Sequence, residues 1–117
     1  MFYKQYMDIL KKKHFRIICS KSYGLELLLL LIQSTIDDDD FGIQETYDLV
    51  KYNKPRKQAF IKFINNLEGR GYIYRQQSKS KKSRIVLRLE EDYVEELIRI
   101  LDLNTIDYLQ ELIKTTK

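Results

Sequence analysis

The sequence predicts a mainly α fold with a small β-hairpin, that is, an α+β chain with one hydrophobic core. Its 117 residues match the usual size of a single domain. Hydrophobic residues make up 44% and charged residues 32% of the chain, as in globular rather than disordered proteins. Apolar residues recur at helical spacing along much of the chain, whereas runs rich in β-forming residues lie at 72–75 and 85–89. We therefore expect one domain, residues 1–117, built mostly of helices.

The first third of the chain is expected to hold two helices followed by an acidic turn. Helical spacing of apolar residues predicts the first helix over 2–13. The second, over 23–33, is apolar on nearly every side, so we expect it at the centre of the core, with Ser20 or Ser22 as its cap. Four consecutive aspartates at 37–40 predict a solvated turn.

Residues 44–52 predict a short third helix, and a turn at 53–54 leads into a fourth. Pro55 fits the first position of this fourth helix, because the N–H that proline lacks would have no partner there. The helix is expected to end near Gly69 or Gly71. Its apolar residues form a stripe that should face the core: Phe60, Phe63, Ile64 and Leu67.

Two strands are expected over 72–75 and 85–89, joined by the polar, lysine-rich loop 76–84. Acidic residues then predict the first turn of a helix over 91–101, because the helix dipole favours negative charge there. A last helix is expected over 104–115. This order of helices and strands is that of a winged helix-turn-helix.

Positive charge is concentrated in the middle of the chain. Residues 54–88 hold eleven of the 21 lysines and arginines but only one of the 17 acidic residues, although the whole chain has a net charge of +4. The flanking segments together are therefore negative. This asymmetry predicts that the middle of the chain attracts polyanions and that the flanks repel them.

In a winged helix-turn-helix, the polar face of the fourth helix and the hairpin loop would bind double-stranded DNA. The helix, about 55–68, fits the major groove, where Arg or Lys reads guanine and Gln or Asn reads adenine. The basic wing, about 76–84, would contact phosphates or enter the minor groove. The residues predicted to contact DNA are Lys54, Arg56, Lys57, Gln58, Lys62, Asn65, Arg75, Lys79, Lys81, Lys82 and Arg84.

Two segments of the sequence resemble the second half of the MarR family of transcription regulators. They are LEGRGYIYR at 67–75 and, after the loop, SRIVLRL at 83–89. Within that family, the short, lysine-rich and alanine-poor chain is most similar to the staphylococcal accessory regulator (SarA-like) branch. The resemblance covers 22–101 in the order of elements and is motif-like over 58–89.

The resemblance also has consequences for the wing and for assembly. Arg84 stands where the family has the arginine of its wing motif, whereas Lys82 and Ser83 stand where the family has acidic residues. What the resemblance implies is a homodimeric transcription regulator, in which the terminal helices, about 1–13 and 104–115, make the dimer interface.

A dimer is expected from the residues as well. Specific DNA binding usually needs two half-sites about one helical turn apart, which a two-fold dimer supplies. Apolar stripes outside the winged core are candidates for the interface. They comprise Phe2, Tyr6, Ile9 and Leu10 at one end and Ile106, Leu109, Leu112 and Ile113 at the other. The alternative is that these helices pack on their own domain.

We expect no enzyme, no metal site and no cofactor. His14, the one histidine, follows three lysines at a helix end, so we interpret it as a surface or capping residue, and it leaves too few ligands for zinc. Cys19 suits ordinary burial, although Arg16 or Lys21 nearby also allow the alternative of a redox switch.

The longest apolar run, 27–32, is too short to cross a membrane, and the N-terminus does not resemble a signal peptide, so a cytoplasmic location is expected. Two other functions remain open. One is a winged-helix DNA-binding protein of plasmid or phage replication or partition, and the other is a protein-binding winged helix. The sequence does not indicate a small-molecule effector.

Overall fold

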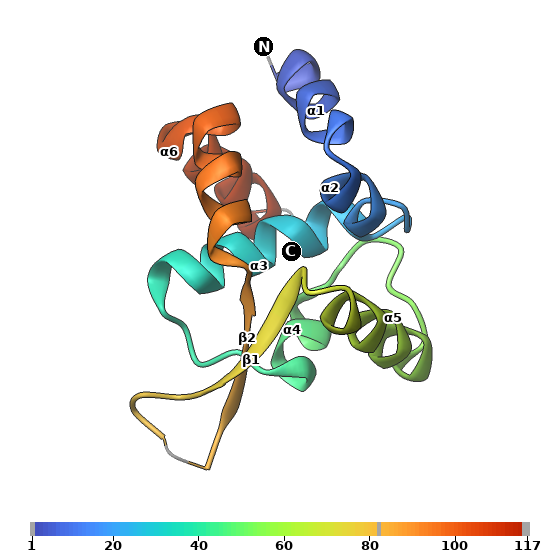
Figure 1. Cartoon of the computed structure of the whole chain (residues 1–117), viewed down its shortest axis with the longest axis vertical. Helices are drawn as coiled ribbons and strands as arrows, with labels where there is room; N and C mark the ends of the chain where they lie inside the picture. The colour runs from blue at the N-terminus through green and yellow to red at the C-terminus, as the bar shows by residue number, and fades with distance from the viewer. Residues whose placement is uncertain (1, 82, 116–117) are drawn as a thin grey trace.

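The computed structural model describes the backbone of residues 2–81 and 83–115 and the side chains of residues 3–81, 83–102 and 111. In this range the chain is mainly helical with one antiparallel hairpin, as the sequence predicts (Figure 1). In chain order the elements are α1 (Phe2–Lys11), α2 (Lys13–Ile18), α3 (Gly24–Asp37), α4 (Ile43–Leu49), α5 (Lys57–Gly69), β1 (Ile73–Gln77), β2 (Ile85–Leu89) and α6 (Glu91–Thr115).

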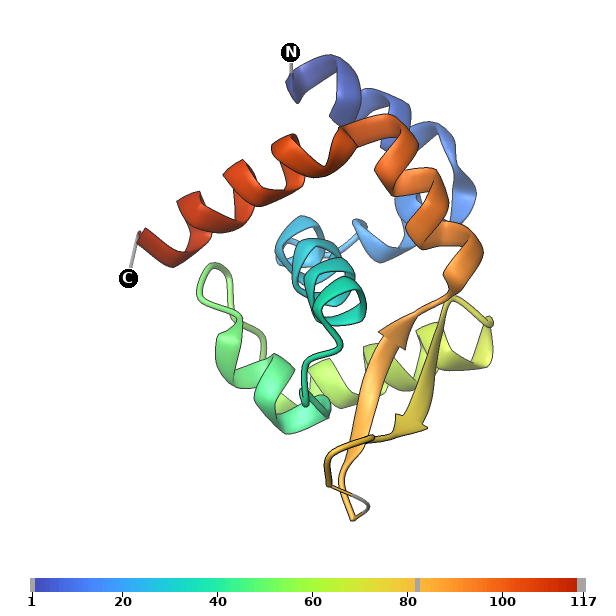
Figure 2. The same ribbon diagram turned by 90° about the vertical axis from the view of Figure 1, so that its left-hand side faces the viewer.

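Helix α3 lies at the centre of the molecule, as predicted, with the other helices and the hairpin around it (Figures 1 and 2). Leu27, Leu28, Leu31 and Ile32 are all buried, and they join one core cluster with residues from α1 to α6. Burial of each such side chain stabilises the fold by about 1.5 to 3 kcal/mol. The helix ends at Asp37, four residues later than expected, although Ser34 is its last buried residue.

The start of α3 approaches the end of α2 very closely. A Cβ atom at Gly24 would lie 2.5 Å from the carbonyl oxygen of Ile18 and equally close to the backbone of Cys19. Only glycine fits this position. Neither predicted serine caps α3, since Tyr23 is its N-cap residue and the Ser20 hydroxyl instead donates to the Ile17 carbonyl, 2.6 Å away, at the end of α2.

Strands β1 and β2 pair antiparallel, with Ile73 opposite Leu89 and Gln77 opposite Ile85. The N–H of Leu87 donates to the carbonyl of Phe41 at 2.9 Å, which attaches the chain between α3 and α4 to β2. The predicted hairpin is thus confirmed. Strand β1 begins one residue later and ends two residues later than the expected range 72–75.

Helix α6 is bent at Asp102, whose φ of 47° and ψ of 164° are not helical. The helices predicted over 91–101 and 104–115 therefore follow one another directly on either side of this residue. Figure 2 shows the resulting bend, with α1 and α6 together at the upper end of the molecule and α4, α5 and the hairpin at the lower end.

Further differences from the prediction concern α2, the end of α4 at Leu49 rather than near residue 52, and the start of α5. A separate α2 follows α1, and its Phe15 and Ile18 are fully buried. Helix α5 begins at Lys57 rather than at Pro55, because Arg56 has extended backbone angles (φ −65°, ψ 146°). The carbonyl of Pro55 accepts a hydrogen bond from the Tyr47 hydroxyl at 2.8 Å, which holds this residue in the turn between α4 and α5.

The interpretation of His14 as a surface or capping residue is wrong. Its ring stacks on Tyr93 of α6 with 3.8 Å between centroids, and its Nε2 atom lies 3.3 Å from Glu96 Oε2. The imidazole and the carboxylate are both more than three-quarters buried. Burial lowers the pKa of His14, while Glu96 acts in the opposite direction.

Cys19 is packed against the core, and burial raises the pKa of its thiol to about 12. The thiol is thus protonated at neutral pH, which favours ordinary burial over a redox switch.

Candidate nucleic-acid interface

Helix α5 has one buried face and one polar face. The stripe that the sequence predicts is confirmed, since Phe60, Ile64 and Leu67 are fully buried and Phe63 nearly so. With 3.6 residues per turn, burial of this stripe directs the opposite face to solvent. Four of the predicted DNA contacts occupy the exposed side of the helix: Lys57, Gln58, Lys62 and Asn65.

The turn that leads into α5 is fixed by a residue that the sequence analysis missed. Glu26, on the first turn of α3, is 8% exposed, and its carboxylate accepts the backbone N–H groups of Lys51 and Tyr52 at 2.9 and 3.1 Å. Lys54 lies nearby, with its Nζ 4.5 Å from the centre of the Tyr47 ring. In the sequence, only the presence of an acidic residue within an apolar helix indicates that Glu26 could hold this turn.

Arg75 connects β1 to α5. Its Nε donates to Glu68 Oε1 at 2.9 Å, and its Nη2 donates to Asn65 Oδ1 at 2.7 Å. Arg75 and Asn65, both predicted to contact DNA, are therefore bonded to each other, and Glu68 offsets the charge of the arginine.

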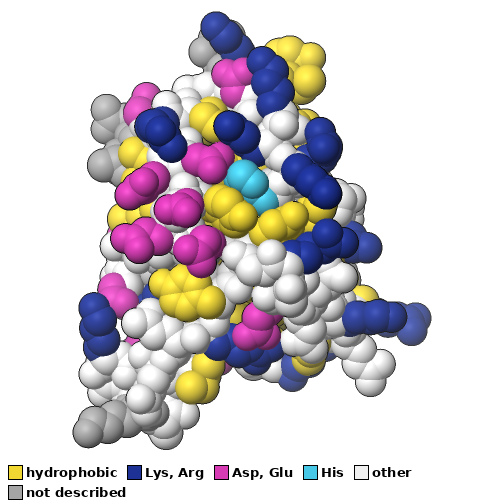
Figure 3. Space-filling model, viewed as in Figure 1, with side chains coloured by type: hydrophobic (Ala, Val, Ile, Leu, Met, Phe, Trp, Pro, Cys, Tyr) yellow, Lys and Arg dark blue, Asp and Glu magenta, His cyan; other side chains and the backbone are white. Residues whose placement is uncertain are grey.

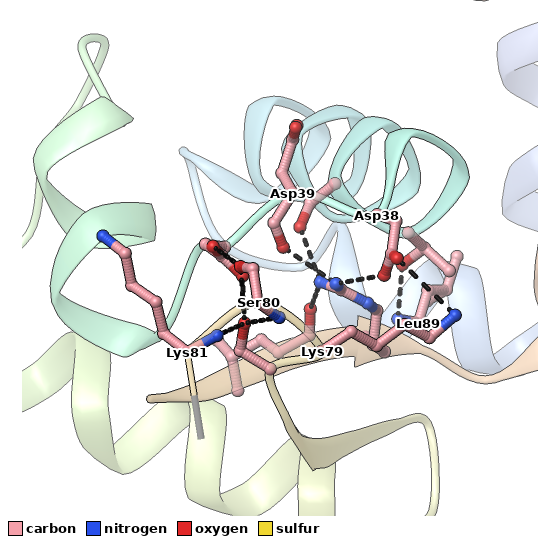
Figure 4. A network of polar contacts seen from close by, with 12 residues as sticks. Asp38, Asp39, Lys79, Ser80, Lys81 and Leu89 are labelled. Carbon is pink, nitrogen blue, oxygen red and sulfur yellow. Dashed lines mark hydrogen bonds and ion pairs between the residues drawn. The ribbon is translucent and has the colours of Figure 1, made fainter. Parts of the chain in front are cut away.

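The acidic turn between α3 and α4 is not merely solvated, because it holds the base of the hairpin loop (Figure 4). The Ser78 hydroxyl donates to Asp40 and accepts the backbone N–H groups of Ser80 and Lys81, each at 3.2 Å. The Ser80 hydroxyl also donates to Asp40, at 2.6 Å. The hydrogen bond from Ser78 lowers the pKa of Asp40.

Asp38 holds two basic residues of the hairpin. Its carboxylate accepts a 2.9 Å hydrogen bond from Arg88 and lies 3.6 Å from the Lys79 ammonium. Arg88 itself is 4% exposed and also donates to the Asp39 carbonyl and the Ser34 hydroxyl. The bond from Arg88 is the main reason that the pKa of Asp38 is lowered. The aspartates thus neutralise part of the hairpin's charge.

Arg84 joins the hairpin to α4. Its Nη1 donates to Glu45 Oε1 at 2.8 Å and to the Asp40 carbonyl at 3.2 Å. The same Glu45 oxygen accepts the N–H of Gly42 at 2.8 Å, at the start of α4. The side chain predicted as a phosphate contact is therefore engaged within the chain.

The predicted contacts consequently fall into two groups. Arg75, Lys79 and Arg84 are paired with carboxylates. Lys82 lies outside the described residues. Among the described side chains, no carboxylate lies within ion-pair distance of the remaining exposed basic residues, which are Lys54, Arg56, Lys57, Lys62 and Lys81.

Charge is also segregated over the surface. Figure 3 shows acidic side chains gathered on the left over α6 and basic side chains along the right edge, over α1, α2 and α5. The described part of the chain contains no group of three histidine, cysteine or acidic side chains that could hold a metal ion. None of its helices is long and apolar enough to cross a membrane.

Comparison of the chain with protein-family models, with curated proteins and with solved structures found no match. We therefore infer the function from the geometry and charge of these residues.

Proposed function

We propose that this protein is a sequence-specific, double-stranded DNA-binding transcription regulator with a winged helix-turn-helix fold, acting in the cytoplasm. In this proposal α4 and α5 are the helix-turn-helix, α5 is the recognition helix, and the hairpin of β1 and β2 is the wing. The observation that carries it is the exposed polar face of α5, opposite a fully buried stripe and beside a basic hairpin at the same end of the molecule (Figure 2).

The dimensions and chemistry of α5 suit the major groove. A helix with its side chains is about 10 to 12 Å wide, close to the groove's width of about 12 Å. Gln58 can pair with adenine through two hydrogen bonds, and Lys57 and Lys62 can reach guanine or phosphates. Lys81 on the wing supplies a phosphate contact.

The first test is a titration of labelled duplex DNA at several salt concentrations. Each neutralised phosphate contributes about −0.9 to the slope of log affinity against log salt concentration. A dimer should therefore give a slope of about −4 or steeper. Lys57→Ala or Gln58→Ala should relax sequence preference at defined base pairs by about 1 to 3 kcal/mol. An affinity that does not change with salt would exclude DNA as the partner.

We also propose that the protein acts as a homodimer, joined through α1 and the second half of α6. On α1, Tyr3 and Met7 are 75% and 42% exposed, and Tyr6 and Leu10 are half-buried. The prediction that Ile9 contacts the partner is wrong, because this residue is fully buried in the core of its own chain. The side chains of five predicted interface residues lie outside the described ones: Phe2, Ile106, Leu109, Leu112 and Ile113.

Light scattering tests the dimer. The wild type should show twice the mass of one chain at micromolar concentration. Leu109→Asp plus Ile113→Asp should give a monomer or a destabilised chain with much weaker operator binding. A wild-type mass near 14 kDa together with intact specific binding would rule the dimer out.

A further inference from the structure

A groove of about 650 Å³ runs along one flank of α5. Its lining also includes residues from the end of α2 and from the turn between α2 and α3, together with Pro55. The lining residues that matter for its charge and shape are Lys21, Ala59, Lys62, Phe63, Asn66 and Arg70.

The charge of this groove has one sign. Lys21, Lys62 and Arg70 are exposed, and no acidic residue is among the lining residues. Lys21 is held over the Phe63 ring, with its Nζ 5.5 Å from the centroid. The Nε of Arg70 donates to Asn66 Oδ1 at 2.8 Å, which orients the guanidinium and leaves its two terminal amino groups for a ligand. Three cations that share a groove without a carboxylate suit an anionic ligand.

The groove adjoins the polar face of α5. At 100° per residue, Ala59, Lys62, Asn66 and Arg70 form the strip beside the face that carries Gln58 and Asn65, and Lys62 belongs to both. Glu68 and Arg75 lie on the opposite flank, toward the hairpin. A helix that fills a major groove has a phosphate backbone along each flank. The strip with Lys21 and Arg70 would therefore face one backbone, and the hairpin would face the other.

We propose that this groove binds one phosphodiester strand of the duplex that α5 reads, with Lys21 and Arg70 as phosphate contacts. The inference rests on the proposed function and adds two contacts to it. Lys21 belongs to a flank of the chain that is expected from its charge to repel polyanions. The fold instead brings this residue into the groove beside α5.

The test compares Lys21→Ala, Arg70→Ala and the double variant with Lys12→Ala and Arg99→Ala. The two control variants remove the same charges from exposed positions outside the groove. Each groove variant should lower the affinity for all duplex sequences by about eightfold per subunit at 0.1 M salt, the contribution of one released counterion, and should lower the salt slope by about one for each subunit. Lys21→Arg and Arg70→Lys should retain most of the affinity. Thermal unfolding checks that each variant is folded.

The outcomes separate this inference from the proposed function. If the wild type binds duplex DNA with a steep salt slope but the groove variants behave like Lys12→Ala and Arg99→Ala, the groove does not contact DNA and only this inference fails. If the wild type does not bind duplex DNA, the proposed function fails and the inference fails with it. If both groove variants weaken binding at selected sequences alone, they act on base recognition, and the assignment to phosphates is wrong.

Discussion

The hydroxyl of Ser78 donates a hydrogen bond to the carboxylate of Asp40, which lies 38 positions earlier in the chain. The same hydroxyl accepts the N–H of Lys81, so the position of that lysine depends on Asp40 through one serine. Lys79 turns back to Asp38, whereas the side chain of Lys81 extends away from these contacts (Figure 4). Two lysines of the same loop therefore have different electrostatic surroundings.

We predict that these lysines contribute unequally to DNA binding. Lys81→Ala should weaken binding to all sequences and lower the salt slope by about one for each subunit, because an unpaired lysine releases a counterion from a phosphate. Lys79→Ala should have a smaller effect, because Asp38 already offsets its charge. Salt titrations of both variants by fluorescence anisotropy measure the difference. Equal effects would show that the Asp38–Lys79 pair does not persist in the complex.

Asp40→Ala tests whether Asp40 acts by positioning Lys81 or only through its charge, because the two roles predict changes in DNA affinity of opposite sign. Removal of a negative charge near DNA should raise affinity if only the net charge matters. We expect lower affinity, because Ser78 and Ser80 lose their acceptor and Lys81 loses its fixed position. Asp37→Ala is the matched control, since Asp37 is exposed and precedes the network in the chain. A gain in affinity in both variants would contradict the positioning role.

Glu26→Ala should destabilise the fold and the turn before α5 together. The buried carboxylate accepts two backbone N–H groups, and its loss leaves both without their partner. We expect the free energy of unfolding to fall by about 2 to 4 kcal/mol, as measured by urea denaturation. Glu95→Ala, on the exposed side of α6, should change it little. An unchanged urea midpoint for Glu26→Ala would show that the turn does not depend on this carboxylate.

His14 should make the protein less stable in mild acid. Its pKa lies below the ordinary value of 6.5 in the folded chain, so the unfolded chain takes up the proton first as the pH falls. Stability should therefore decrease from about pH 7 to pH 5. Melting temperatures across this range measure the effect, and His14→Gln should remove it. Because Glu96 opposes the shift, Glu96→Gln should make the loss steeper. If the protein instead became more stable from pH 7 to pH 5, the pKa of His14 would be raised in the folded chain and not lowered.

The spacing of apolar residues along the chain is sufficient to predict the helices and strands that bury those residues at regular intervals. Helix α5 and its four core residues, the central α3 and the hairpin all follow from spacing along the chain. Helix α2 was missed because six residues with two buried side chains give too short a pattern. The start of α5 was misplaced because the Tyr47 hydroxyl binds the carbonyl of Pro55, a contact that proline's usual place in helices does not indicate.

The partners of charged residues could not be predicted from the sequence. Asp38 and Asp40 are 50 and 38 positions away from Arg88 and Ser78, and Arg84 is 39 positions away from Glu45. A run of four aspartates has the composition of a turn whether or not its carboxylates have partners. The sequence therefore shows where the basic residues lie along the chain, but not which of them are paired with carboxylates.

The separation of acidic and basic side chains also has a consequence at long range. Negative charge over α6 and positive charge over α1, α2 and α5 give the molecule an electric dipole (Figure 3). In the field of any polyanion this dipole produces a torque that turns α5 toward the ligand and α6 away before the surfaces touch. A larger share of diffusional encounters then begins in a productive orientation, and this advantage decreases as salt shortens the screening length.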